Sequence, residues 1–140
     1  RSLLADPWKY PKRTEHSEID VKKMVNGIKG REDFRPFAPM ILKENVNRFF
    51  RDGISSPFMN GVREACHEIH DHYPSIMHID GTSRIQEVDE EPHRTLLMEW
   101  EKETGCPMLL NTSLNIKGEP IVNTEEHAKK FEKNTGVKVL

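Results

Sequence analysis

One stretch of the sequence decides the fold: Lys29-Gly30-Arg31-Glu32-Asp33-Phe34-Arg35-Pro36-Phe37-Ala38-Pro39, followed directly by the apolar run Met40-Ile41-Leu42. Its cations, Lys29, Arg31 and Arg35, stand at positions i, i+2 and i+6, which share one face of an extended chain. Each of its two prolines pushes the preceding residue toward extended geometry, so a helix is not expected there. A row of guanidinium and ammonium groups beside a buried strand suits phosphate, although a solvated charged loop fits the same spacing.

Around this stretch the sequence predicts a mixture of strands and helices, and therefore an α/β or α+β fold. A helix over 21–26 would be capped by Ser17 or Asp20 and ended by Gly27. The alternating segments 76–80 and 84–88 predict a hairpin with Gly81-Thr82-Ser83 as its turn. The other expected elements are helices over 44–51, 90–104 and 124–136, strands over 36–43 and 108–110, and an edge strand over 137–140.

The composition is that of one polar domain. The 140 residues are 35% hydrophobic and 31% charged, and a chain of this length can bury a core. The net charge of −2 hides an asymmetry, because residues 1–51 hold 12 Lys and Arg against 7 Asp and Glu, whereas residues 52–140 hold 9 against 16. This pattern favours a local anion site over a surface that coats nucleic acid.

The cysteines and the apolar segments indicate the compartment. Cys66 and Cys106 are too few for a disulfide framework, and the sequence has neither a secretory segment nor a run of membrane-spanning length. A cytoplasmic protein that does not contact membranes is expected. Because the chain begins at Arg1 without Met, we expect it to be a piece of something larger or a processed product.

Two further segments could bind an anion. The turn Asn111-Thr112-Ser113-Leu114-Asn115 follows a short apolar strand, and ligands in open α/β sheets gather at such strand ends. Its hydroxyls and amides could bind phosphate oxygens, a metal-bound water or a nucleobase edge, or only the backbone of the turn itself. Arg84, at the start of a strand, could equally reach a ligand or pair with a carboxylate.

Other segments carry less chemical information. Cys66-His67-Glu68-Ile69-His70-Asp71-His72 contains zinc-ligand side chains, but the only other cysteine is Cys106, so a polar surface helix or loop fits better. His78 could line a polar surface or be an ordinary satisfied histidine. No nucleophile elbow, Walker-type loop or G-x-G-x-x-G occurs. The residues alone therefore indicate an anion-binding α/β domain.

Several motifs in a fixed order resemble the C-terminal domain of the O-carbamoyltransferases, the family of the nodulation-factor, cephalosporin and tobramycin carbamoyltransferases. The resemblance spans nearly the whole chain. The motifs that carry it are Arg1-Ser2-Leu3-Leu4-Ala5-Asp6-Pro7, the stretch 29–39, Ser56-Pro57-Phe58-Met59, His78-Ile79-Asp80-Gly81-Thr82-Ser83-Arg84-Ile85-Gln86, Leu110-Asn111-Thr112-Ser113-Leu114-Asn115 and Gly118-Glu119-Pro120-Ile121-Val122.

The resemblance implies a YrdC-like twisted mixed β-sheet flanked by helices, with residues 1–140 as a single domain. It implies that this domain binds ATP and carbamoyl phosphate and forms carbamoyl adenylate, with Mg²⁺ accompanying the nucleotide. A separate N-terminal transfer domain, actin-like or sugar-kinase-like and absent from this chain, would pass the carbamoyl group to an acceptor hydroxyl. Fe²⁺ or another metal would belong to that domain only, and no metal ligand is expected in this chain.

The resemblance also implies a set of site residues. Lys29, Arg35 and Arg84 would be catalytic. A non-catalytic nucleotide- or RNA-binding module of the same shape is the alternative, although nucleic acid is not the expected partner. The ligand-binding set would be Arg1, Lys29, Arg31, Arg35, Arg84, Thr112, Ser113 and Asn115.

Overall fold

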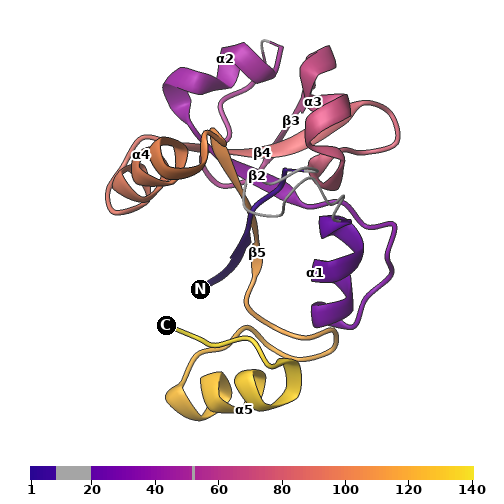
Figure 1. Cartoon of the computed structure of the whole chain (residues 1–140), viewed down its shortest axis with the longest axis vertical. Coiled ribbons are helices and arrows are strands. Elements are labelled where there is room, and N and C mark those ends of the chain that lie inside the picture. Colours follow the sequence, from indigo (N-terminus) through magenta and orange to yellow (C-terminus); the bar gives the residue numbers. More distant parts are fainter. Residues whose placement is uncertain (9–19, 52) are drawn as a thin grey trace.

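A computed structural model of the chain describes residues 1–8, 20–51 and 53–140. Within them, five strands form one mixed sheet in the order β1-β5-β2-β4-β3 (Figure 1). Strands β2 and β4 are parallel, and the other pairs are antiparallel. The predicted α/β class is confirmed. The strands are β1 (Ser2–Ala5), β2 (Ala38–Leu42), β3 (Gly61–Glu64), β4 (Thr82–Val88) and β5 (Met108–Ser113).

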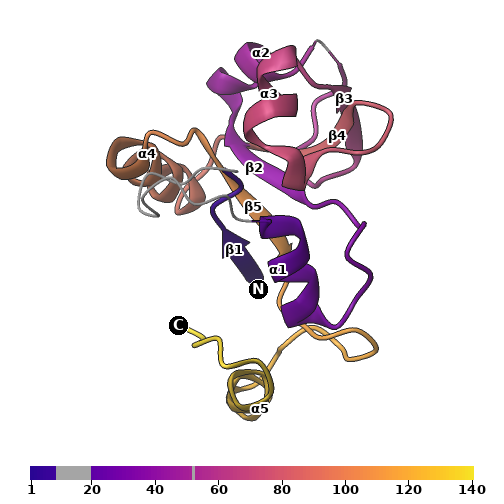
Figure 2. The same cartoon turned by 45° about the vertical axis from the view of Figure 1, so that its right-hand side comes forward.

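The helices cover both faces of this sheet and one of its ends. In Figures 1 and 2, α4 and α1 lie on opposite sides of β5, and α5 lies beyond the end of the sheet. None of the helices that the structure describes is long and apolar enough to cross a membrane. The α-helices are α1 (Val21–Lys29), α2 (Val46–Phe49), α3 (His67–His72), α4 (His93–Thr104) and α5 (Glu125–Thr135), and the 3-10 turns are η1 (Lys43–Asn45) and η2 (Pro74–Ile76).

Successive residues on β2 belong to two of the three core clusters formed by the described residues. Met40 belongs to a cluster with Leu97 of α4, on one face of the sheet. Ile41 belongs to the larger cluster on the other face, which contains Phe49 of α2 and Ile69 of α3. All five residues of β2 are buried, because strand β2 is covered on both faces.

Helix α1 ends later than the sequence predicts. Asp20 caps its first turn by accepting a hydrogen bond from the Lys23 amide at 2.9 Å, as expected. The helix continues through Gly27 to Lys29, and Gly30, at a φ of 62°, ends it. A helix tolerates a glycine such as Gly27 in its interior, whereas its left-handed C-cap position favours a glycine because other residues are strained there. The other candidate cap, Ser17, lies outside the described residues.

This later helix end overturns the predicted row of cations. Lys29 is the last residue of a helix, and residues 30–37 form turns instead of a strand. Lys29, Arg31 and Arg35 therefore do not share the face of an extended segment. The prolines do exclude a helix from residues 35–39, as predicted, but they select a loop that delays the start of β2 to Ala38.

The predicted hairpin is also wrong. Residues 76–80 are not a strand, because Asp80 bends the chain by accepting a hydrogen bond from the Thr82 amide at 3.0 Å. The antiparallel partner of β4 is instead β3, in a segment without a visible period. Strand β5 extends through Ser113, so the turn predicted at 111–115 begins three residues later, at Leu114. Residues 137–140 form no strand, whereas residues 2–5 do.

The final two helices follow their predicted limits more closely. Thr124 caps α5 by accepting a hydrogen bond from the His127 amide at 3.2 Å, and Gly136 ends the helix at a φ of 72°. Helix α4 ends before Gly105, as predicted, but begins at His93 instead of residue 90. The 44–51 helix is shorter than predicted, with a 3-10 turn leading into α2.

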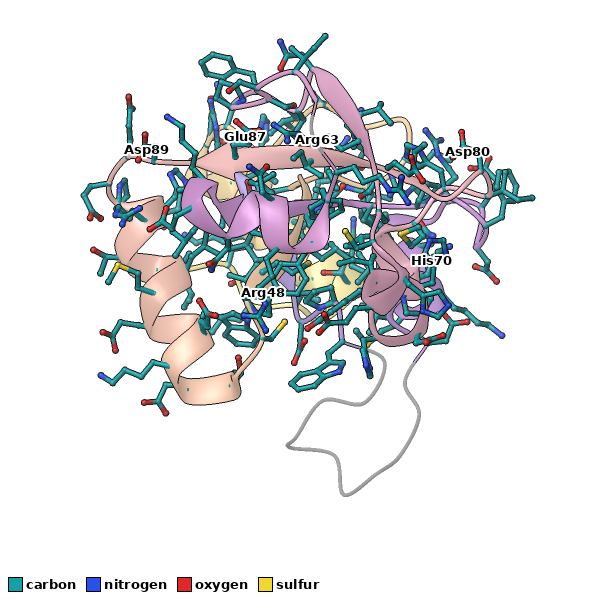
Figure 3. The ribbon with its side chains drawn as sticks, turned by 90° about the horizontal axis from the view of Figure 1, so that it is seen from above. Arg48, Arg63, His70, Asp80, Glu87 and Asp89 are labelled. Atoms are coloured by element: carbon teal, nitrogen blue, oxygen red, sulfur yellow. The ribbon has the colours of Figure 1, made fainter. Side chains whose placement is uncertain are left out.

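A buried ion pair joins β3 to β4. Arg63 Nη2 donates to Glu87 Oε1, and their side chains are 7% and 5% exposed. Figure 3 labels both residues, on neighbouring strands. Ser55 donates to the second carboxylate oxygen at 2.6 Å. The carboxylate therefore holds the edge strand and the loop before it together.

Removal of one partner of this pair should destabilise the fold strongly. Glu87→Gln leaves the Arg63 charge buried without a counterion, so we expect a loss of about 3–5 kcal/mol in the free energy of unfolding. The double variant Arg63→Met/Glu87→Leu should lose less than Glu87→Gln. Urea unfolding measures both, with Glu64→Gln, in an exposed pair with Arg51, as the control expected to lose below about 1 kcal/mol. Equal losses at Glu87 and Glu64 would contradict this assignment.

Candidate anion-binding site

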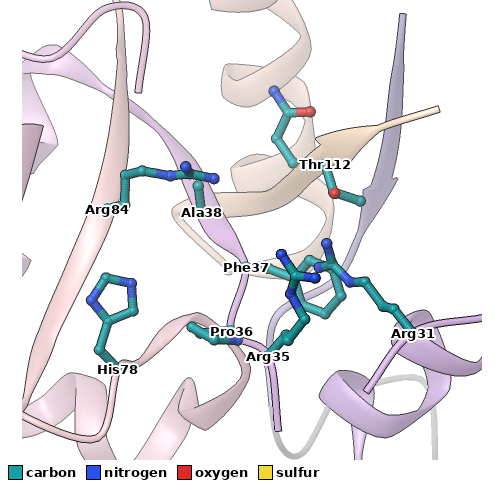
Figure 4. Close-up of a pocket in the computed structure, with 9 residues that line it drawn as sticks. Arg31, Arg35, Pro36, Phe37, Ala38, His78, Arg84 and Thr112 are labelled. Carbon is teal, nitrogen blue, oxygen red and sulfur yellow. The ribbon is translucent and has the colours of Figure 1, made fainter. Parts of the chain in front are cut away.

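A cavity of about 260 Å³ lies between the loop after α1 and the ends of β2, β4 and β5. Three arginines reach it from two different elements: Arg31 and Arg35 from the loop, and Arg84 from β4 (Figure 4). The other lining residues are Pro36, Phe37, Ala38, His78, Asn111 and Thr112. Among the described residues, the lining therefore carries at least three positive charges and no carboxylate.

The first of these arginines is held by two contacts. Its Nε donates to Asn26 Oδ1 at 2.5 Å, and the guanidinium carbon of Arg31 stands 4.4 Å from the ring centroid of Phe37. Asn26 is fully buried, and its amide nitrogen donates to the carbonyls of Asp33, at 3.2 Å, and Arg35, at 2.9 Å. One asparagine side chain thus fixes both the cationic loop and the orientation of Arg31.

The charges at the cavity are poorly compensated. Burial, followed by the charge of Arg35, lowers the pKa of Arg31, and the charge of Arg84 acts in the same direction. Within the described residues, neither Arg31 nor Arg84 forms an ion pair, and Arg35 reaches only Glu32, at 3.5 Å. Arginine keeps its charge under these conditions, so a bound anion would relieve the repulsion among the three guanidinium groups.

Glu32 does not neutralise the cavity. Its carboxylate also accepts a hydrogen bond from Lys117 at 2.5 Å, and this hydrogen bond is the main cause that lowers the pKa of Glu32 to about 2. Glu32 thus remains ionised and shares its charge between Lys117 and Arg35 at the exposed rim.

A buried lysine cluster, defined as Lys29, Ser113 and Asn115, adjoins the cavity. The ammonium group of Lys29 donates to the carbonyl of Ser113, to the carbonyl of Asn115 at 2.9 Å and to Asn115 Oδ1 at 3.0 Å. Only 3% of Lys29 is exposed. Burial, followed by the charge of Arg31, lowers the pKa of Lys29 to about 8. The ammonium group therefore joins α1 to the end of β5 instead of pointing into the cavity.

The eight ligand-binding residues predicted from the sequence fall into three places. Arg31, Arg35, Arg84 and Thr112 line the cavity. Lys29, Ser113 and Asn115 form the adjoining lysine cluster. Arg1 lies elsewhere, because its guanidinium donates to Asn123 Oδ1, beside Pro120 and His127.

Sequence reasoning missed several residues that build the site. The sequence predicts Asn26 only as the last residue of a helix; the signal for its role is its position five residues after Val21 and beside Val25, on the buried face of the helix. The sequence predicts Phe37 only as part of the charged stretch and of the strand over 36–43, whereas in the structure its ring contacts the guanidinium group of Arg31. The sequence allows His78 to be either a polar lining residue or an ordinary satisfied histidine, and in the structure it lines the cavity. Its ring Nδ1 also lies 2.9 Å from the Thr82 hydroxyl.

The His-rich segment 66–72 does not join the site. Residues His67–His72 form α3, and the ring of His67 faces Asp71 at 3.8 Å on an exposed surface. Among the residues that the structure describes, no three or more histidine, cysteine, aspartate or glutamate side chains are grouped to hold a metal ion.

The structure is an α/β domain with a cationic cavity, and comparison with known proteins places it in a family. The family model described as "Carbamoyltransferase C-terminus" matches residues 1–140. Nodulation protein NolO of Bradyrhizobium diazoefficiens is 38% identical, over 91% of this chain and 23% of its own length. Nodulation protein NolNO of Sinorhizobium fredii is 37% identical, over 89% of this chain and 18% of its own length.

A third relative comes from an archaeon. An uncharacterised protein of Methanocaldococcus jannaschii is 36% identical, over 91% of this chain and 20% of its own length. The chain belongs to the carbamoyltransferase C-terminal family. It spans about a fifth of the length of the curated relatives it matches.

Loss of the Asn26 amide should both destabilise the fold and weaken anion binding. Asn26→Leu leaves two backbone carbonyls and the Arg31 Nε without their partner, so we expect a loss of about 2–4 kcal/mol in the free energy of unfolding. Sulfate affinity, measured by NMR titration, should fall about tenfold because Arg31 loses its fixed orientation. Asn45→Leu, which removes only an amide contact to Glu101, is the control. Unchanged sulfate affinity in Asn26→Leu would refute the positioning role.

Anion affinity should decrease as the pH rises through about 8. Lys29 is charged below its pKa of about 8 and neutral above it, and its charge acts on the cavity through Arg31. Sulfate keeps its charge over this range, so its affinity should fall about threefold between pH 7 and pH 9. Lys29→Gln, which retains a donor but no charge, should remove this pH dependence. A pH dependence that persists in the variant would contradict the role of Lys29.

Proposed function

We propose that this chain activates carbamoyl phosphate with ATP and forms carbamoyl adenylate, as the C-terminal part of an O-carbamoyltransferase. One observation carries the proposal: three arginines with almost no carboxylate compensation converge on one cavity in a domain of the carbamoyltransferase C-terminal family. A polyphosphate supplies the negative charge that such a cluster lacks, and arginine binds phosphate oxygens in a bidentate manner.

The size of the cavity favours the phosphate and carbamoyl groups over a complete nucleotide. Its volume of about 260 Å³ lies just below the roughly 300–1,000 Å³ of typical small-molecule sites. We therefore place the reacting phosphate and carbamoyl groups among the arginines and the remainder of the nucleotide outside them.

The proposed reaction consumes water and releases two phosphate products. Hydrolysis of carbamoyl phosphate releases inorganic phosphate and carbamate. A carbamate oxygen then bonds to the α-phosphorus of ATP as the bond from that phosphorus to the bridging oxygen breaks, and pyrophosphate leaves with the electron pair. Negative charge increases on the leaving oxygen, so fixed guanidinium groups would stabilise the transition state.

The residues present divide this work between them. Arg31, Arg35 and Arg84 would bind the phosphate oxygens, and the Thr112 hydroxyl would donate one further hydrogen bond. Lys29 would act by position and charge, since its ammonium group is occupied by Ser113 and Asn115.

Neither Mg²⁺ binding nor transfer to the acceptor is assigned to the side chains of the cavity. No carboxylate lines the cavity in the part of the chain that the structure describes, so Mg²⁺ would be held through the phosphate oxygens of ATP. Transfer of the carbamoyl group to a hydroxyl of a small molecule or nucleoside, and any Fe²⁺ or other metal that this step uses, would belong to an N-terminal transfer domain of the same polypeptide.

Exchange of labelled pyrophosphate into ATP tests the proposal. The exchange should require carbamoyl phosphate, and Arg84→Ala should slow it at least about a hundredfold, because one oxyanion donor is commonly worth that much. Arg51→Ala is the matched control, since Arg51 lies outside the cavity and forms an exposed ion pair with Glu64. ATP or RNA binding without carbamoyl-phosphate-dependent exchange would overturn the enzymatic assignment and favour a non-catalytic binding module.

A further inference from the structure

A pair of amide side chains bridges the central strand beside the cavity. Asn111 Nδ2, on β5, donates to Gln86 Oε1, on β4, at 2.7 Å. In the register of the sheet, Asn111 lies opposite Ala38 of β2, and Gln86 lies opposite Met40 of the same strand. The methyl side chain of Ala38 leaves the space through which the two amides meet. We refer to Asn111 and Gln86 as the amide pair.

Each member of the amide pair retains one unused polar group. Within the described residues, Asn111 Oδ1 and Gln86 Nε2 have no protein hydrogen-bond partner. Asn111 is only 8% exposed, yet it lines the cavity. A carbonyl oxygen and an amino group thus remain available side by side, and an exchange of oxygen and nitrogen in both amides would leave the same two groups.

We infer that the amide pair binds the carbamoyl group, and this inference rests on the proposed function. A carbamoyl group is planar and presents an NH₂ donor and a C=O acceptor, as an asparagine amide does. Its NH₂ donates to Asn111 Oδ1, and its C=O accepts from Gln86 Nε2. The carbamoyl group would therefore form one hydrogen bond to each amide of the pair, as a third amide side chain would.

The neighbouring arginine is placed for the other end of the substrate. Arg84 precedes Gln86 by two residues on β4, so the two side chains share a face of the sheet and leave the strand about 7 Å apart. In Figure 4 the guanidinium of Arg84 extends over the sheet toward Ala38, the residue that the amide pair spans. A small molecule with a phosphate at one end and a carbamoyl group at the other fits between them.

This recognition predicts discrimination against acyl phosphates without an amino group. Acetyl phosphate has the same shape and charge, but its methyl group would leave Asn111 Oδ1, on a residue only 8% exposed, facing an apolar group. Sites built to hydrogen-bond an NH group reject analogues that lack it. The chain should therefore bind carbamoyl phosphate at least about tenfold more tightly than acetyl phosphate.

Calorimetric titration of the chain with carbamoyl phosphate, acetyl phosphate and inorganic phosphate tests the inference. Asn111→Leu and Gln86→Met remove the amides with little change in volume. In each variant the preference for carbamoyl over acetyl phosphate should fall toward one, and carbamoyl phosphate should lose more affinity than inorganic phosphate. Asn45→Leu is the control, because Asn45 lies in the turn η1 that follows the opposite end of β2 from the cavity. If Asn111→Leu does not fold, Gln86→Met, whose residue is only partly buried, decides the test.

Three other results would overturn the inference and are distinguishable from one another. Equal binding of carbamoyl and acetyl phosphate by the unmodified chain would remove the recognition role, while the proposed function could still be supported by pyrophosphate exchange. Weaker ATP binding in the variants with an unchanged preference would assign the pair to the adenine edge. Absence of both carbamoyl phosphate binding and exchange in the unmodified chain would remove the proposed function and the inference together.

Discussion

The hydrogen bonds of one buried ammonium group hold the two halves of the site together. Lys29 ends α1, and its side chain donates to Ser113 and Asn115 at the end of β5. The backbone adds a second connection, since the Lys117 amide donates to the Lys29 carbonyl at 2.8 Å. Because Arg31 follows two residues after Lys29, and Thr112 directly precedes Ser113, this connection places both at the same cavity.

The cavity collects like charges at a cost to the fold. Three guanidinium groups share it, and Glu32 at the rim is their one counterion among the described residues. The buried amide of Asn26 and the ring of Phe37 keep Arg31 in place despite this repulsion. Such local destabilisation is typical of functional sites, and a bound polyphosphate would convert the repulsion into attraction.

The predictions of secondary structure succeeded where one local signal dominated. Thr124 and Gly136 limit α5 because a cap and a left-handed glycine act within a few residues. The predictions failed where two local signals competed, or where the pairing of strands decided which segment became a strand. Gly27 and Gly30 both could end α1, and only the tertiary contacts of Lys29 select the second. Strand β3 has no period of its own and is a strand because it pairs with β4.

The sequence by itself determined the family motifs, the class of fold and the arginines of the cavity, because cation type and motif order are local properties. It did not determine their geometry. The tertiary structure decided that Lys29 serves the end of β5, that Arg1 lies apart, and that Asn26, Phe37, Gln86 and Asn111 build the surroundings of the cavity. These roles arise from strand order and register, which bring together side chains up to 122 positions apart, and such pairing cannot be read from spacing along the chain.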